Sequence, residues 1–98
     1  MSYYSKKEWN LLGFRKAKTK RSMYSAIIYN KQNKQLKRTI NFGDKFYENF
    51  SDRTGLNLYP KLIHGDEKRK DNYRKRHKKD LREGYYSAGY FSWKYLWS

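Results

Sequence analysis

The sequence predicts an α+β fold: a small β-hairpin or sheet packed with a basic helix and a short aromatic C-terminal helix, after an extended N-terminal arm. Three observations predict it. Two stretches with strand character enclose a polar linker within residues 22–42, a charged segment with helical spacing follows at 66–83, and aromatic residues crowd 85–98. A chain of 98 residues has room for one domain, which we place at 22–98 after an arm at 1–21.

The arm, residues 1–21, shows no clear hydrophobic periodicity, so we expect an extended segment anchored by a few apolar side chains. Its second half is a run of Lys and Arg. A solvated linker is one interpretation of such a run. We favour contact with an anionic partner, because the run adjoins the first predicted strand and lies near aromatic residues. The candidate anion contacts of the arm are Arg15, Lys16, Lys18, Lys20 and Arg21.

A β-hairpin is predicted next. Residues 22–29 are rich in β-branched and aromatic side chains, and residues 36–42 alternate between an apolar and a polar side. Arg38 interrupts the apolar side, which places it at the strand edge. The polar residues between the two strands, 30–35, are few enough to close a hairpin, and Gly43 ends the second strand.

Residues 44–63 carry much of the apolar material but no regular pattern. Gly55 and Pro60 prevent a long helix or strand here. We therefore expect irregular structure, with room for one helical turn near residues 45–50.

The strongest helix signal covers residues 66–83. Asp66 is placed to cap the first turn, oppositely charged pairs recur three or four residues apart, and Gly84 is placed to cap the end. Tyr73 and His77 lie four apart on one narrow stripe that Leu81 continues, so the helix packs along one seam and offers cations elsewhere. Its candidate anion contacts are Lys70, Arg74 and Lys78.

The C-terminal segment, residues 85–98, predicts a short helix that Ser87 caps. Both faces of this helix are apolar, and a helix that is apolar all round is buried. We expect it to cover the hairpin on one side and another subunit on the other, since interfaces favour Trp and Tyr as anchors. The candidate protein contacts are Tyr90, Phe91, Trp93, Leu96 and Trp97.

Catalytic and metal sites are not predicted. The chain has no Cys, and the spacing of its two histidines, His64 and His77, fits no metal-binding motif. Helix capping explains Asp66 and Glu67 better than an acid pair for hydrolysis, and no Ser or Thr has a base at a readable spacing. Phosphate-binding glycine loops are absent. We expect no enzyme, no metal or other cofactor and no small-molecule substrate.

The charge points to an anionic partner. Lys and Arg number 24 against 9 Asp and Glu, so the net charge is +15, and self-repulsion of that size opposes folding in isolation. Nucleic acid, an anionic membrane face and an acidic protein lattice would each provide negative charge that offsets this repulsion. No apolar run is long enough to span a membrane, and residues 1–10 do not resemble a signal peptide, so we expect no transmembrane segment and no secretion.

Three sequence blocks occur in one order along residues 22–98. They are Asn41-Phe42-Gly43, then His64-Gly65-Asp66 leading to Tyr73 and Arg76-His77, and finally Ala88-Gly89-Tyr90-Phe91-Ser92-Trp93 followed by Leu96-Trp97. In this order the chain resembles short, basic, uncharacterised proteins encoded by large nucleocytoplasmic DNA viruses of algae and protists. It departs from that pattern in a longer link from Phe42 to His64 and in Lys94-Tyr95, which replaces a more apolar pair.

The resemblance implies a viral origin and a virion component, and it implies no catalytic residue. We therefore expect a minor, capsid-associated structural protein, made in the host cytoplasm and located in the virion. It would act as cement or linker between larger capsid subunits, with the aromatic tail as anchor and the basic arm on a partner. The alternative is a sequence-independent nucleic-acid-binding protein, acting in genome condensation or on ribosomal-type RNA.

Overall fold

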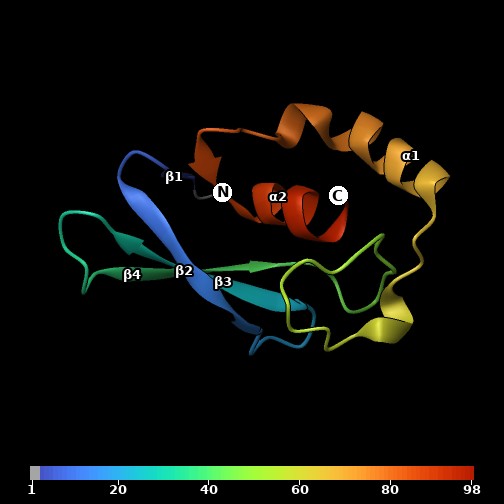
Figure 1. Ribbon diagram of the computed structural model, residues 1–98, viewed down its shortest axis with the longest axis horizontal. Helices are drawn as coiled ribbons and strands as arrows, with labels where there is room; N and C mark the ends of the chain where they lie inside the picture. The colour runs from blue at the N-terminus through green and yellow to red at the C-terminus, as the bar shows by residue number, and fades with distance from the viewer. Residues whose placement is uncertain (1–2) are drawn as a thin grey trace.

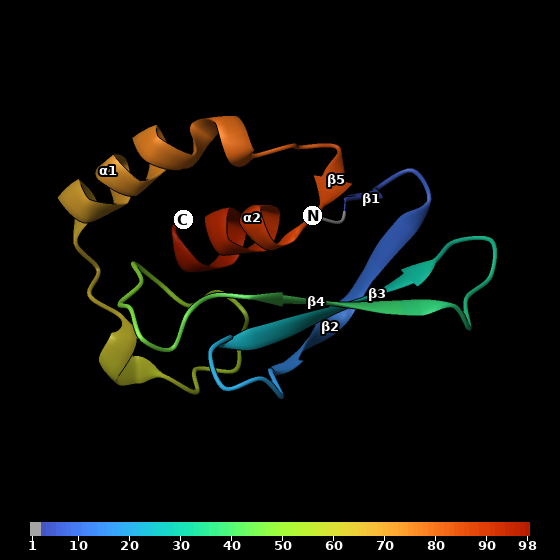
Figure 2. The same ribbon diagram turned by 180° about the vertical axis from the view of Figure 1, so that it is seen from behind.

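The computed structural model describes residues 3–98 and has a mixed α+β architecture, which confirms the predicted fold class. Its main sheet forms one layer, and the C-terminal helical segment lies on one face of that sheet (Figure 1). Helix α1 covers the other side of the C-terminal segment, so the chain folds into three layers (Figure 2). Residues 1–2 of the predicted arm lie outside the described residues.

The main sheet is antiparallel, with the order β2-β3-β4. Its strands are β2 (Trp9–Lys16), β3 (Tyr24–Asn30) and β4 (Lys37–Phe42). The predicted hairpin is confirmed as β3 and β4, in which Tyr24 faces Phe42 and Ala26 faces Ile40. These four side chains point to the helical layer and are buried, because alternate residues of a strand share one face of the sheet.

The predicted arm contributes strands to both sheets. Strand β2 pairs along β3, and β1 (Tyr4–Ser5) pairs with β5 (Tyr85–Tyr86) near the C-terminal helix. Strands β1 and β2 of the predicted arm are therefore part of the same fold as residues 22–98. The register shifts between Leu11 and Gly13, and this bulge breaks the alternation that would have indicated a strand.

Residues 44–63 are irregular, as predicted, apart from the 3-10 helix η1 (Pro60–Leu62) and one bridge between Asn49 and Ile63. No helix forms at 45–50; a turn follows Asp44 there instead. The irregular segment is fastened to the sheet by the Tyr24 hydroxyl, which donates to the Asp52 carboxylate. Burial and this carboxylate raise the pKa of Tyr24 to about 12.

Helix α1 (Glu67–His77) begins where predicted, with the Asp66 carboxylate accepting hydrogen bonds from the first-turn amides of Lys68 and Arg69. Its predicted end is wrong. The helix passes at Lys78 into a 3-10 turn, η2 (Lys78–Asp80), and the chain is extended at Leu81. Gly84 is not a helix cap, because the chain turns back here and the Gly84 carbonyl accepts from the Lys6 amide, next to the β1–β5 pair.

The C-terminal segment is helical, as predicted, and consists of α2 (Ala88–Phe91) and a π-helical turn, η3 (Ser92–Leu96). The Ser87 hydroxyl caps α2 by accepting from the Tyr90 amide. Side chains from this segment and from the sheet form the hydrophobic core. Its buried members are Trp9, Met23, Tyr24, Ala26, Ile28, Ile40, Phe42, Phe91, Leu96 and Trp97.

Within residues 3–98, no helix has both the length and the apolar composition needed to cross a membrane.

Candidate functional site

The aromatic tail is mostly enclosed by its own chain. Of the predicted protein contacts, Phe91 and Leu96 have no exposed surface and Trp97 is 8% exposed, while Tyr90 and Trp93 are half-buried. The outer side, which we expected another subunit to cover, is covered by α1. Contact of Phe91, Leu96 or Trp97 with another molecule would therefore require this fold to open.

The seam of α1 makes this cover. The Tyr73 ring stacks on the Trp97 ring, with centroids 4.2 Å apart and planes at 4° to each other. The His77 ring packs against the Tyr73 ring on the same seam, with their centroids 4.3 Å apart. The spacing of Tyr73 and His77 thus correctly indicated a packing stripe, but the surface on which it packs is the chain's own tail.

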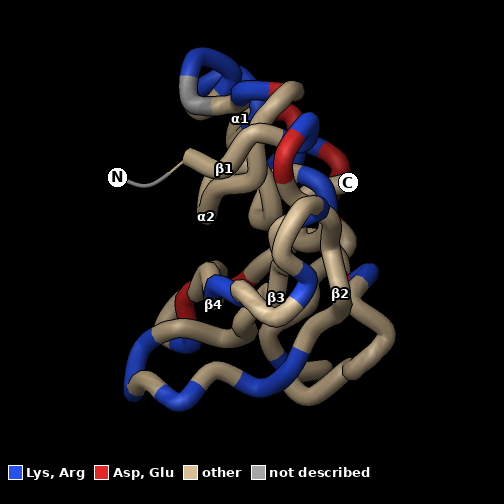
Figure 3. The backbone as a smooth tube through the Cα atoms, turned by 90° about the vertical axis from the view of Figure 1, so that its left-hand side faces the viewer, with Lys and Arg blue, Asp and Glu red and all other residues tan. Residues whose placement is uncertain are grey.

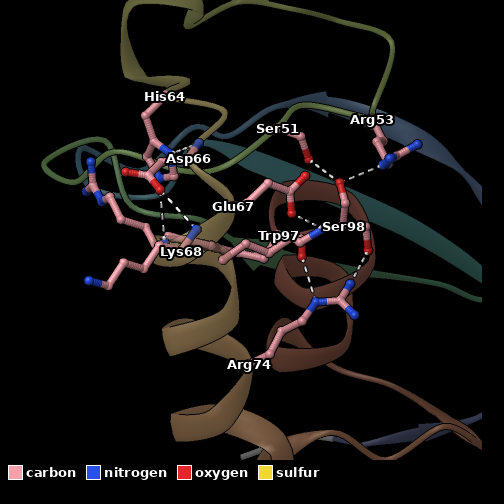
Figure 4. Close-up of polar contacts among 11 residues, drawn as sticks. Ser51, Arg53, His64, Asp66, Glu67, Lys68, Arg74, Trp97 and Ser98 are labelled. Atoms are coloured by element: carbon pink, nitrogen blue, oxygen red, sulfur yellow. Dashed lines mark hydrogen bonds and ion pairs between the residues drawn. The ribbon is translucent and has the colours of Figure 1, made fainter.

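Arg74 also serves this packing. Its guanidinium donates to the Trp97 carbonyl at 3.0 Å and to the Ser98 hydroxyl at 3.1 Å (Figure 4). The guanidinium also lies 4.9 Å from the centre of the Trp93 ring. Arg53 and Ser51 hold the same end of the chain, since both donate to the Ser98 backbone oxygen at 2.9 Å. Arg74, a predicted anion contact, therefore helps to fix the tail through two of its five N–H donors.

Lys70 is the second predicted anion contact with partners inside the fold. Its ammonium lies 2.9 Å from the Glu67 carboxylate and 4.6 Å from the centre of the Phe50 ring. Lys78, by contrast, is exposed at the end of α1. The three helix positions thus differ in what they can offer to another molecule.

The predicted basic strip at the end of β2 is open to solvent. All five of its cations are exposed: Arg15, Lys16, Lys18, Lys20 and Arg21. In Figure 3 this segment runs along the lower edge, and the cations of α1 lie at the top. The strip and the cations of α1 therefore lie on opposite sides of the core.

A short aromatic loop, residues 44–47, lies beside this strip. Arg21 pairs with the Asp44 carboxylate at 2.7 Å, and its guanidinium lies 5.6 Å from the Phe46 ring and 5.8 Å from the Tyr47 ring. Phe46 is 70% exposed and Tyr47 is 62% exposed. Sequence reasoning missed this pairing of rings and cations because no periodic signal marks it; the one hint is that both rings follow a turn after Gly43.

The Asp44 carboxylate stays ionised in this loop. Desolvation opposes ionisation, but a hydrogen bond from the Phe46 amide and the charge of Arg21 outweigh it and lower the pKa of Asp44. The carboxylate can therefore keep Arg21 in place at neutral pH.

A groove of about 900 Å³ separates this loop from α1. Tyr47 lines it on the loop side, and Arg69, Lys75 and Arg76 line it on the helix side. Glu48 also lines the groove, but Arg69 pairs with it at 2.9 Å. The groove has the size of a ligand site. Asp44 lines it as well, so its three cations exceed its two carboxylates by one, a small surplus that favours an anionic ligand over a neutral one.

The histidines belong to the packing. His64 Nδ1 accepts from the Asp66 amide at 2.8 Å, and its ring lies 5.4 Å from Trp97 (Figure 4). Desolvation, and then the charge of Arg69, lower the pKa of His64, which favours the neutral ring. In the part of the chain that the structure describes, no three His, Cys, Asp or Glu side chains gather in a way that could hold a metal ion.

Known proteins offer no further guide to this arrangement. The chain matches no protein-family model, no curated protein and no solved structure. The features that bear on its function are therefore the basic strip, the aromatic loop and the groove.

Proposed function

We propose that this protein binds nucleic acid without sequence specificity, through its basic strip and the cationic groove. One observation carries the proposal: a chain with a net charge of +15 buries Phe91, Leu96 and Trp97 of its aromatic tail in its own core and leaves the cations of the strip 15–21 exposed. Lys and Arg that neutralise phosphates release bound counterions, which supplies most of the affinity in sequence-independent binding.

The placement of the acids supports this interpretation. Asp44, Glu48, Glu67 and Glu83 each pair with one Lys or Arg of the same chain. None of these four ion pairs involves Lys16, Lys18 or Lys20 in the middle of the strip. An arrangement of exposed point charges along an extended segment suits the regular spacing of a phosphate backbone.

A structural role in a virion, as cement or linker between capsid proteins, is the second candidate. Tyr90 and Trp93 of the tail keep part of their surface and are the residues that favour it. One face of each ring already has a partner, because Lys6 lies 4.1 Å from the Tyr90 ring and Arg74 lies 4.9 Å from the Trp93 ring. We rank it second because its strongest anchors, Phe91 and Leu96, are inside the core.

The test is the salt dependence of binding to a short DNA duplex. The logarithm of the binding constant should fall linearly with the logarithm of salt from about 50 to 200 mM, and scrambling the duplex sequence should not change it. Replacing Arg15, Lys16, Lys18 and Lys20 by Gln should lower the slope by about 0.9 for each phosphate that the variant no longer neutralises.

A variant with the same loss of charge provides the control. Replacing Lys31, Lys34, Lys37 and Arg38 by Gln removes four exposed cations from the hairpin turn and from β4. If this variant lowers the slope as much as the strip variant, net charge and not the strip determines binding. No binding of the wild type at low salt, together with release alongside the shell from a disrupted particle, would favour the structural role instead.

A further inference from the structure

We infer that the loop 44–47 is a stacking platform for unpaired bases, so that the protein prefers single-stranded nucleic acid to duplex. This inference rests on the proposed nucleic-acid binding and specifies its substrate class. It follows from how the loop holds Phe46 and Tyr47.

The two rings are unusual for their exposure. Phe46 and Tyr47 are 70% and 62% exposed, the largest values among the large hydrophobic side chains that the structure describes. They are also neighbours in the chain and lie beside the basic strip. The other exposed rings, Tyr3 at 37% and Tyr85 at 43%, are less exposed and contact each other edge to face at 6.4 Å. A pair of adjacent exposed rings offers flat surfaces on which bases can stack, whatever the base.

The loop is held in place by the basic strip. The Lys45 amide donates to the Arg21 carbonyl at 2.7 Å, and the Lys45 ammonium donates to the Thr19 carbonyl at 3.1 Å. Asp44 adds its pair with Arg21 and accepts from the Phe46 amide at 2.9 Å. The rings therefore project from a fixed turn, and a ligand would not have to order the loop before stacking on it.

Cations lie where phosphates of a stacked strand would pass. On one side Arg21 lies near both rings and continues into the exposed Lys20 and Lys18. On the other side Tyr47 lines the groove that Lys75 and Arg76 also line. A strand that crosses the two rings thus meets cations on both sides, which is the combination found in single-strand binding sites.

The exposed rings, and not the charge, favour nucleic acid over an acidic protein surface as the occupant. An acidic surface would satisfy the cations but gives Phe46 and Tyr47 no flat partner. A duplex would satisfy the cations too, yet its bases are already stacked on each other. Single strands alone use the rings and the cations together.

The experiment compares oligo-dT of about 20 to 30 nucleotides with a duplex of the same length, at one salt concentration. The double variant Phe46→Ala, Tyr47→Ala should lose about tenfold or more in affinity for oligo-dT. The single variant Phe46→Ala, which leaves the lining of the groove unchanged, should lose affinity for oligo-dT and keep its affinity for the duplex. Phe46→Trp, which provides a larger ring, should retain single-strand affinity. The matched control is Leu12→Ala, Leu58→Ala, which removes two exposed apolar side chains elsewhere and should change neither affinity.

The outcomes separate this inference from the proposed function. If the wild type binds neither probe, nucleic-acid binding itself fails. If it binds both and the double variant still binds oligo-dT within about twofold of wild type, the platform is overturned while the proposed function stands. Equal losses for oligo-dT and duplex in Phe46→Ala also overturn it, because stacking on bases would spare the duplex.

Discussion

The C-terminal segment and the loop 44–47 are both rich in aromatic residues, yet the fold treats them in opposite ways. In the tail Phe91 and Leu96 are fully buried, while in the loop Phe46 and Tyr47 are the most exposed rings that the structure describes. The tail has the sheet on one side and α1 on the other. The loop has Arg21 beside its two exposed rings. Aromatic content alone thus does not identify a contact surface; neighbouring elements decide it.

The cations show the same contrast. Arg74 gives its donors to the Trp97 carbonyl and the Ser98 hydroxyl and so fixes the tail. Arg21 pairs with Asp44, yet its side chain remains 64% exposed beside the loop. An arginine in the first setting stabilises the fold, and one in the second remains available to a phosphate.

The largest expected effect separates the two groups of rings by stability. Phe91→Ala removes a fully buried ring and should lower the free energy of unfolding by about 3 to 5 kcal/mol, whereas Phe46→Ala should change it by no more than about 0.5 kcal/mol. Urea denaturation followed by tryptophan fluorescence measures both.

If Phe91→Ala does not fold, Phe91→Leu can be compared with Phe46→Ala instead. Its loss of unfolding free energy should be smaller than that of Phe91→Ala and still larger than that of Phe46→Ala. Similar losses of unfolding free energy at positions 91 and 46 would contradict the conclusion that Phe91 belongs to the core and Phe46 does not.

An intermediate effect is expected at Gly43, which connects the two regions. Its φ of +77° is left-handed, and an added Cβ would lie 2.9 Å from a Leu96 methyl carbon and 3.0 Å from Met23. Gly43→Ala should therefore cost about 2 to 4 kcal/mol, from backbone strain and from overpacking together.

Two other glycines separate these contributions. Gly55 has a φ of +85° but open space around it, so Gly55→Ala should show the backbone cost alone, about 1 to 2 kcal/mol. Gly13 has neither a positive φ nor a close neighbour, and Gly13→Ala should be neutral or slightly stabilising. If Gly43→Ala costs no more than Gly55→Ala in thermal or urea unfolding, the loop and the tail are not closely packed at this point.

The smallest effect is a pH dependence at His64, which contacts Trp97 of the tail. Desolvation, then Arg69, lower the folded pKa of His64 below its ordinary value of 6.5, so the unfolded chain binds more protons as the pH falls through 6.5. Stability should decline from pH 6.5 down to the folded pKa and should not change through this group above pH 6.5. Protonation would also remove the acceptor for the Asp66 amide.

Unfolding free energies measured from pH 7.5 to 4.5 check this, with His64→Gln and His77→Gln as the pair of variants. The decline should disappear in His64→Gln and persist in His77→Gln. A decline that persists in His64→Gln would assign it to other groups.

Local sequence features predicted β3, β4, α1 and the C-terminal helical segment, but not β1, β2 or β5. Alternation indicated the hairpin strands, Asp66 and Ser87 indicated the starts of two helices, and Gly43 indicated the end of β4. Each of these depends on residues within a few positions of one another. Strand β2 was missed because the bulge at Leu12 interrupts its alternation, and the helix end at His77 was missed because the later β1–β5 pairing decides it.

The sequence by itself determined the charge, the β3–β4 hairpin and the starts of α1 and α2, since these follow from composition and short-range spacing. Only the tertiary structure decided which rings and cations remain available. Tyr73 and Arg74 reach the tail across 23 or 24 residues of chain, and Arg21 reaches Asp44 across 23. Such contacts depend on how layers stack in space, and that stacking leaves the loop 44–47 and the basic strip exposed while Phe91, Leu96 and Trp97 of the tail are buried.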